Sequence, residues 1–122
     1  MLESTSSARI VMTTVVSPEE AARLGRALVE ERLAACATLL PAVHSIYHWK
    51  DQIESSAECL LLLKTASDRL PALEARLHEL HSYQTPEFLV LAIEAGSHPY
   101  LAWLDASLRE PEARACHPIL RA

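Results

Sequence analysis

Glycine, cysteine and long apolar runs are all scarce in this chain of 122 residues. The two glycines, Gly25 and Gly96, are too few to build a glycine-rich phosphate-binding loop. The three cysteines, Cys36, Cys59 and Cys116, make an odd count without a Cys-x-x-Cys pair, which argues against a disulfide framework and a structural zinc site. No stretch approaches the roughly 20 apolar residues of a membrane helix, so we expect no membrane partner.

Basic residues are also in deficit. Eleven Lys and Arg oppose 16 Asp and Glu, and the resulting net charge of −5 is not the basic footprint of a nucleic-acid-binding protein. The first residues lack the charged-then-apolar order of a secretory signal, so we expect the protein in the cytoplasm. Half of the residues are apolar, which at this length predicts one domain with one hydrophobic core.

The apolar patterning predicts the element order strand–helix–strand–strand–helix–strand, followed by a third helix. Ser17-Pro-Glu-Glu20 predicts a helix start, since Ser caps, Pro fits the first turn and Glu at the third position can bond back. The run Phe88 to Ile93 is almost continuously apolar and predicts a central strand. We expect strands over 10–16, 36–49, 52–65 and 86–94, and helices over 17–33, 67–80 and from 100 onward.

Lys50-Asp51 predicts a two-residue turn between the two long strands. That turn places Tyr47 opposite Glu54 and Val43 opposite Glu58. Pro41 removes a ladder donor and predicts either a bulge or a free edge, and a bulge would shift only the far half of the hairpin.

This element order predicts the α+β class, as an antiparallel sheet with two helices on one face. The uncovered face carries Tyr47 and Trp49, which favours self-association. We expect the folded domain over residues 10–108 with a flexible segment at 1–9, and a tail at 109–122 that contains a possible short edge strand.

The segment His81-Ser-Tyr-Gln-Thr-Pro-Glu87 is the richest cluster of polar side chains, at a helix-to-strand junction. His81 and Glu87 can both ligate metals, which would make the segment a metal-binding pocket. The simpler interpretation is a hydrogen-bonded turn, after which Pro86 makes the chain enter the strand in an extended conformation. His78 and His81 are three residues apart, not the four of a zinc-binding helix.

Other chemistry-bearing residues favour structural roles. His44 and His48 share a strand face but lie about 13 Å apart, so they cannot hold one ion together. Cys36 and Cys59 are each set among apolar residues and are interpreted as core thiols. Without a nucleophile–base pair, we predict that the protein is not an enzyme.

Five segments, in this order along residues 10–108, resemble the CutA family of divalent-cation-tolerance proteins. They are Arg32-Leu-Ala-Ala-Cys36, Ile46-Tyr-His-Trp49, Leu63-Lys-Thr65, His81-Ser-Tyr-Gln-Thr-Pro-Glu87 and Tyr100-Leu-Ala-Trp103. The resemblance implies a ferredoxin-like homotrimer, similar to the PII signalling proteins, that is connected with copper and other divalent cations and uses no organic cofactor. Departures from the family pattern are Met12 and Thr13 where some members have a cysteine, Ser82 where Pro is common, and Asp51 where Gly is usual.

The resemblance implies a metal site with His81 as its ligand, and Glu87 and Glu58 are the further ligands that this chain offers. The cleft around it would be lined by Tyr83, Lys64, Trp103, Tyr47 and Trp49. A second hypothesis is a PII-like sensor or scaffold, in which Lys64 and Tyr83 hold a small anion or contact a partner protein at a cleft between subunits.

Overall fold

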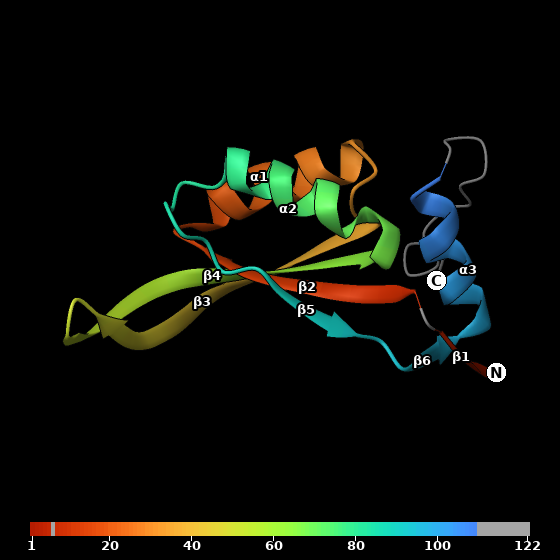
Figure 1. Cartoon of the computed structure of the whole chain (residues 1–122), viewed down its shortest axis with the longest axis horizontal. Helices are drawn as coiled ribbons and strands as arrows, with labels where there is room; N and C mark the ends of the chain where they lie inside the picture. Colours follow the sequence, from red (N-terminus) through yellow and green to blue (C-terminus); the bar gives the residue numbers. More distant parts are fainter. Residues whose placement is uncertain (6, 110–122) are drawn as a thin grey trace.

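The computed structural model describes residues 1–5 and 7–109 of the chain (Figure 1). Three α-helices, one short 3-10 helix and six strands follow one another in that part. In chain order they are β1 Leu2–Ser4, β2 Ala8–Val15, α1 Pro18–Glu30, β3 Cys36–Trp49, β4 Gln52–Ala66, η1 Ser67–Arg69, α2 Leu70–Leu80, β5 Leu89–Ala92, β6 Ala95–Ser97 and α3 His98–Ser107.

The main sheet has four antiparallel strands in the order β3-β4-β2-β5, and α1 and α2 lie side by side on one of its faces (Figure 1). This is the predicted α+β arrangement. The core lies between the helices and the sheet because alternate strand residues point to that face. Its fully buried members include Val11 and Val15 of β2, Leu61 and Leu63 of β4, and Leu24, Leu28, Leu73 and Leu77 of the helices.

The start of α1 follows the predicted cap. The Ser17 side chain accepts a hydrogen bond from the Glu20 amide at 3.1 Å, and Pro18 occupies the first turn. The helix ends at Glu30, three residues before the predicted end. The chain leaves it through Arg32, whose φ of 60° lies in the left-handed region and redirects the backbone toward β3.

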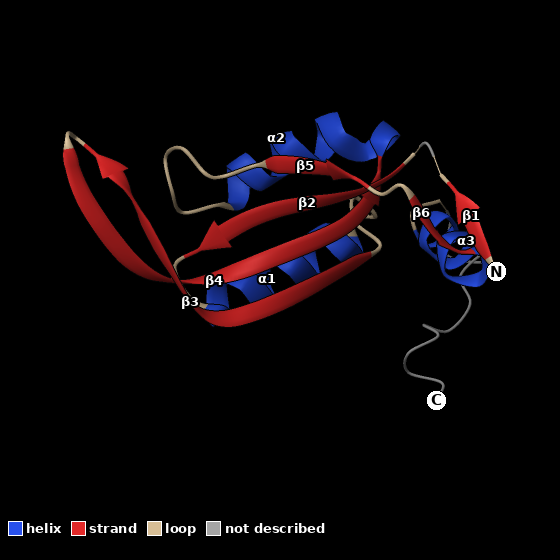
Figure 2. Ribbon diagram, turned by 90° about the horizontal axis from the view of Figure 1, so that it is seen from below, coloured by secondary structure: helices blue, strands red, loops and turns tan. Residues whose placement is uncertain are grey.

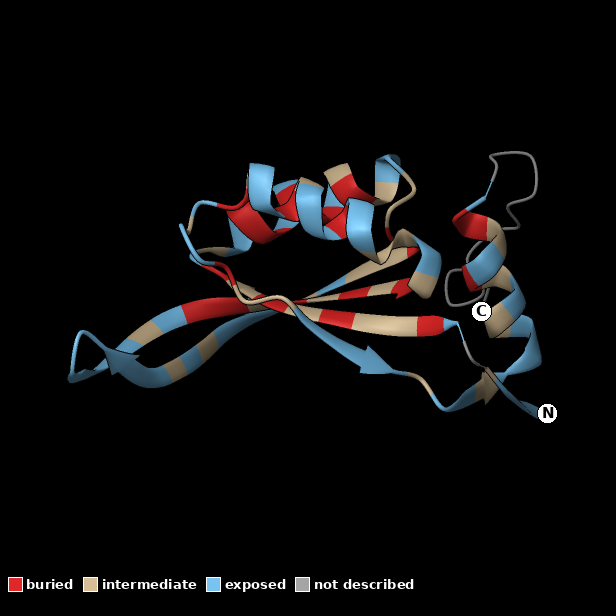
Figure 3. Ribbon diagram, viewed as in Figure 1, coloured by how far each residue is buried: buried red, intermediate tan, exposed pale blue. Residues whose placement is uncertain are grey.

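The hairpin of β3 and β4 has the predicted turn and register. Lys50 and Asp51 both have positive φ, as a two-residue hairpin turn of the I′ type requires, and Tyr47 pairs with Glu54. The register shifts between Leu40 and Val43, so the bulge at Pro41 is confirmed. Beyond it the two strands extend past the helices as an arm that is almost fully exposed (Figure 3).

The prediction of a central fourth strand was wrong. β5 pairs only with β2 among the described strands and lies at the edge of the main sheet. Its residues Leu89, Val90 and Leu91 are 54%, 45% and 44% exposed. A continuously apolar strand normally indicates cover on both faces, and a single chain does not provide that cover here.

The N-terminal segment differs from prediction too. Residues 1–9 were expected to be flexible, but Leu2–Ser4 forms β1, which pairs with β6, and β2 already begins at Ala8. The third helix, α3, packs at the same end of the molecule, with Leu104 and Leu108 against Ala35 and Ala66. The predicted edge strand in the tail lies outside the described residues.

Candidate functional site

The candidate site is the loop between α2 and β5, drawn tan in Figure 2. It begins at His81, which caps the C-terminal end of α2 by donating its amide to the Leu77 carbonyl at 2.9 Å. Pro86 is buried and Glu87 is half-buried just before β5. The loop therefore crosses from the helix layer to the sheet, where its side chains meet β2 and β4.

His81 lies in the interior, and its side chain has no exposed surface. Its Nε2 lies 2.9 Å from the Thr14 carbonyl oxygen and its Nδ1 accepts the Tyr83 amide hydrogen at 3.0 Å. A carbonyl can only accept, so Nε2 carries the proton and donates to Thr14. Both ring nitrogens are thereby engaged within the chain, and neither is open to a ligand.

Glu20 is a site residue that the sequence pattern indicated only as part of a helix cap. It is 6% exposed, and its carboxylate accepts hydrogen bonds from the Ser82 amide at 2.9 Å and the Ser82 hydroxyl at 3.0 Å. Burial opposes its ionisation, but these bonds and a further one from the Val16 amide outweigh burial and lower the pKa of Glu20. The sequence indicated only that Glu20 occupies the third helical position, and this position does not reveal a hydrogen-bond partner 62 residues away.

Tyr83 connects the loop to β4. Its hydroxyl donates to Oε2 of Glu58 at 2.6 Å, and its ring packs 4.8 Å from the His81 ring. Burial and the neighbouring Glu58 carboxylate raise the pKa of Tyr83 above its usual value, so the phenol stays protonated and keeps donating. Glu58 is only 8% exposed, although it lies on the sheet face opposite the helices.

Glu87 adds a second carboxylate near Glu58. Burial first, and then the charge of Glu58, raise the pKa of Glu87. Its Oε2 is buried and has no hydrogen-bond partner among the described residues. Contacts thus run from His81 to Tyr83 and from Tyr83 to Glu58. The charge of Glu58 acts on Glu87, whose buried Oε2 is left without a hydrogen-bond partner among the described residues.

The other predicted cleft residues lie elsewhere in the single chain. Lys64 is six residues from Glu58 along β4, about 20 Å away. Its ammonium group lies 3.4 Å from the Tyr100 hydroxyl, and the Tyr100 ring contacts Trp103 of α3. Tyr47 and Trp49 lie toward the tip of the hairpin arm, 40% and 57% exposed.

Cation ligands do not converge within one chain. In residues 1–5 and 7–109, no group of three or more His, Cys, Asp or Glu side chains is arranged to hold a metal ion. Cys59 is buried, as predicted, and burial raises the pKa of its thiol. Cys36 is half-buried rather than a core thiol.

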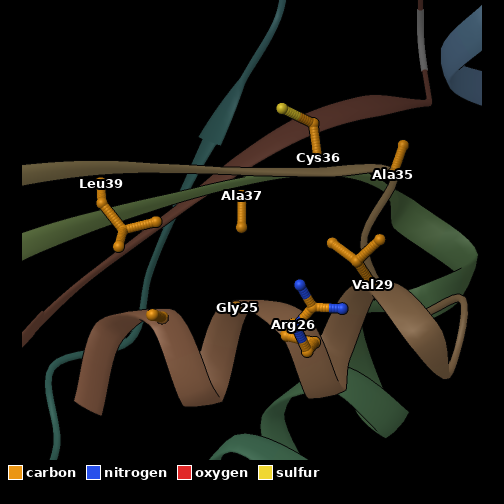
Figure 4. Close-up of a pocket in the computed structure, with 8 residues that line it drawn as sticks. Gly25, Arg26, Val29, Ala35, Cys36, Ala37 and Leu39 are labelled. Carbon is orange, nitrogen blue, oxygen red and sulfur yellow. The ribbon is translucent and has the colours of Figure 1, made fainter. Parts of the chain in front are cut away.

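A cavity of about 450 Å³ lies away from the loop, between α1 and the edge strand β3 (Figure 4). The Ala37 side chain points into it toward Gly25, whereas the Cys36 sulfur points away from α1. None of the predicted site residues lines it; the lining residues are Ala22, Gly25, Arg26, Val29, Ala35, Cys36, Ala37 and Leu39.

No helix in the described part of the chain has the length and apolar character needed to cross a bilayer.

The fold and the loop together define an α+β protein with a ferredoxin-like sheet and an acidic, tyrosine-containing junction between α2 and β5. The family profile of the CutA1 divalent ion tolerance protein matches residues 9–107, and the chain belongs to that family. The divalent-cation tolerance protein CutA of Pectobacterium atrosepticum is 42% identical over 100 residues, which cover 82% of this chain and 91% of that protein. The Thermus thermophilus protein of the same name is 44% identical over 95 residues, 78% of this chain and 92% of its own.

Solved structures agree with this assignment. CutA from Synechococcus elongatus superposes with a TM-score of 0.86 at 39% identity, covering 88% of this chain and 96% of that one. The periplasmic divalent cation tolerance protein CutA of Archaeoglobus fulgidus gives a TM-score of 0.81 at 31% identity, covering 84% of this chain and 99% of that one.

Proposed function

We propose that this protein, whose relatives are named for divalent-cation tolerance, binds a divalent cation, and that Glu58 and Glu87 supply the direct ligands. The observation that supports this most is Glu87 Oε2, which is buried without a hydrogen-bond partner near a second carboxylate. Two carboxylates in a low-dielectric setting repel each other, and a cation bound between them would remove that repulsion and occupy the unused acceptor.

The assignment of His81 as a metal ligand stays a prediction. For its Nδ1 to ligate an ion, the Tyr83 amide must first give up its 3.0 Å hydrogen bond to that atom. Copper is the ion that the family resemblance names first, and imidazole suits copper better than carboxylates alone do. The two ligand sets therefore predict different ion preferences, because the carboxylate pair favours manganese or calcium.

Calorimetric titration with Cu²⁺ and, separately, Mn²⁺ tests the proposal. We expect Glu87→Gln and Glu58→Gln each to weaken binding by tenfold or more. A His81→Ala variant that binds Cu²⁺ like the wild type removes His81 from the ligand set. Unchanged binding in both carboxylate variants overturns the proposed site, and absence of binding in the wild type overturns the function.

We also propose a homotrimer. The sheet face opposite the helices carries apolar side chains that no element of the described chain fully covers, and the edge strand β5 and the hairpin arm are exposed as well. Such a surface favours burial against other copies of the same chain. The side chains concerned are Ile10, Met12, Leu60, Leu62, Leu89 and Leu91.

Sedimentation velocity measures the assembly directly. We expect a trimer mass for the wild type and a lower mass for Leu91→Glu, which places a charge on this face. Glu94→Gln, an exposed change next to the same strand, serves as the control and should leave the trimer intact. A monomeric wild type at micromolar concentration contradicts the proposal.

The second candidate function, a PII-like sensor or scaffold trimer, is favoured by a separate cluster. Lys64 lies over the Tyr100 ring at 5.6 Å, and that ring contacts Trp103, so an ammonium group and two aromatic faces lie together. This chemistry suits a small anion with an aromatic group. Thermal shifts with a panel of metabolites, lost in Lys64→Ala and absent with metal ions, would favour this function over cation binding.

We propose further that the protein has no catalytic activity and works in the cytoplasm. The Cys59 thiol is buried with a raised pKa, the opposite of an activated nucleophile, and Cys36 and Cys59 are both free thiols, which suits a reducing compartment. The Archaeoglobus relative is named as periplasmic, so cell fractionation with compartment markers is the decisive measurement.

A further inference from the structure

Glu20 connects the first turn of α1 to the loop that carries the candidate site. Its Oε2 accepts the Ser82 amide hydrogen at 2.9 Å, and its Oε1 accepts the Ser82 hydroxyl hydrogen at 3.0 Å. Ser82 itself is exposed, whereas Glu20 is 6% exposed, so the loop is held from the interior. A buried carboxylate that receives two bonds from one residue fixes the position of that residue closely.

Ser82 stands between the two residues whose orientation sets the site. On one side, His81 donates from Nε2 to the Thr14 carbonyl and accepts the Tyr83 amide at Nδ1. On the other side, Tyr83 reaches Glu58 through its hydroxyl. A shift of Ser82 would therefore move the imidazole and the phenol together and lengthen the 2.6 Å bond to Glu58.

Capping of α1 does not account for the place of this carboxylate. The Ser17 hydroxyl already accepts the Glu20 amide hydrogen at 3.1 Å, and the bond from the Val16 amide to Glu20 Oε1 is long, at 3.4 Å. The shorter bonds of Glu20 go to Ser82. Oε2 lies 4.0 Å from His81 Nδ1, too far for a direct hydrogen bond, so Glu20 acts on His81 through Ser82.

We propose that Glu20 is a positioning residue of the candidate site, which acts through Ser82 to hold His81 in the Nε2-protonated tautomer and Tyr83 against Glu58. The proposal rests on the proposed cation function only for its effect on affinity. Its effect on the geometry of the loop can be measured in the protein without any ion. The positioning role of Glu20 and the proposed cation function can therefore fail separately.

The test compares Glu20→Gln with Ser17→Ala in the full chain. Ser17→Ala removes the cap hydrogen bond of the same helix turn but leaves the bonds to Ser82, so it is the matched control for lost helix stability. Ser82→Ala is the second variant, because it removes only the hydroxyl bond at an exposed position and should fold.

Nitrogen-15 NMR of the imidazole ring reports the tautomer of His81, which a His81→Gln variant identifies among the six histidines. We expect Glu20→Gln to lose the single Nε2-protonated form and to weaken Mn²⁺ binding by about tenfold, as outer-sphere partners do. Ser82→Ala should weaken it less, and Ser17→Ala should lower the melting temperature with tautomer and affinity unchanged. Wild-type tautomer and affinity in Glu20→Gln, with only a lower melting temperature, overturn the proposal.

If the wild type binds neither Mn²⁺ nor Cu²⁺ and the tautomer still changes in Glu20→Gln, the positioning role stands and the proposed function falls. If Ser17→Ala changes the tautomer as much as Glu20→Gln does, the effect comes from the helix end in general, and the specific role of Glu20 is rejected.

Discussion

The Tyr83 hydroxyl donates a 2.6 Å hydrogen bond to Glu58 Oε2, and this contact joins the loop after α2 to the middle of β4. Glu58 is 8% exposed, so its carboxylate depends on the phenol for much of its polar environment. The bond links the most distinctive segment of the sequence to the sheet face opposite the helices, where we propose that subunits meet.

Removing this bond should destabilise the protein. Tyr83→Phe leaves a nearly buried carboxylate without its donor, and the loss expected for such a group is about 1–3 kcal/mol. Urea unfolding at a fixed protomer concentration measures it. Glu58→Gln is the partner variant: the double variant should lose less than the sum of the two single losses, and strict additivity would show that the contact contributes nothing.

Gly25 is required by close packing of α1 on β3. A Cβ at this position would lie 2.9 Å from the Cβ of Ala37, which has no flexible side chain to move aside. Glycine-to-alanine changes in a helix normally stabilise by up to about 1 kcal/mol, but here we expect Gly25→Ala to destabilise by about 1–3 kcal/mol. Thermal or urea unfolding shows whether Gly25→Ala raises or lowers the free energy of unfolding.

Ala37→Gly serves as the suppressor of this change. It removes the atom that the new Cβ would strike, so the double variant should recover part of the loss despite the cost of glycine in a strand. If Gly25→Ala stabilises the protein, the contact seen between α1 and β3 is wrong.

Glu87 should weaken the fold at neutral pH when no cation is bound. Burial and Glu58 raise its pKa in the folded state above the value in the unfolded chain, so the folded state holds its proton to higher pH. Stability is therefore full below the unfolded pKa and falls as the pH rises through the folded pKa. Glu87→Gln should be more stable than the wild type at pH 7, with the difference vanishing in acid.

Unfolding curves between pH 3.5 and 8, in buffer with a chelator, measure this difference. Glu79→Gln is the control because its carboxylate is exposed on α2. A Glu87→Gln variant that is less stable than the wild type at pH 7 would mean that the carboxylate has a partner that offsets its burial.

The C-terminal end of α3 is held by two arginines. Arg32 donates to the Ser107 carbonyl and Arg69 to the Leu108 carbonyl, each at 2.6 Å. Arg32→Ala should release this helix end, with an expected loss of about 1.5–3 kcal/mol for a charged donor. Hydrogen exchange should accelerate in α3 while α1 and α2 stay protected.

Arg26→Ala is the control, because Arg26 lies on α1 and its ion pair with Glu30 is exposed. Equal exchange rates in α3 of the wild type and Arg32→Ala would show that Leu104 and Leu108 hold the helix without the arginine.

Local chemistry made part of the site predictable. His81 and Tyr83 are two residues apart in one short loop, so their contact could be expected from the sequence. Glu58 joined them through the hydrogen bond from Tyr83, a tertiary contact across 25 positions that the hairpin register does not set. Glu20 was missed because its bond to Ser82 spans 62 positions, and no periodicity encodes such a distance. Lys64 lies apart from Tyr83 because six strand residues separate it from Glu58, and Trp103 of α3 lies near Lys64 through the Tyr100 ring.

The sequence by itself determined the α+β class, the cap of α1, the turn at Lys50-Asp51 and the bulge at Pro41, since each depends on backbone preferences within a few residues. Only the tertiary structure decided that β5 lies at an edge, that β1 pairs with β6, and that the ring nitrogens of His81 are already used. Strand order and hydrogen-bond partners are set by contacts between distant segments, whose free energy depends on packing in three dimensions rather than on local preference.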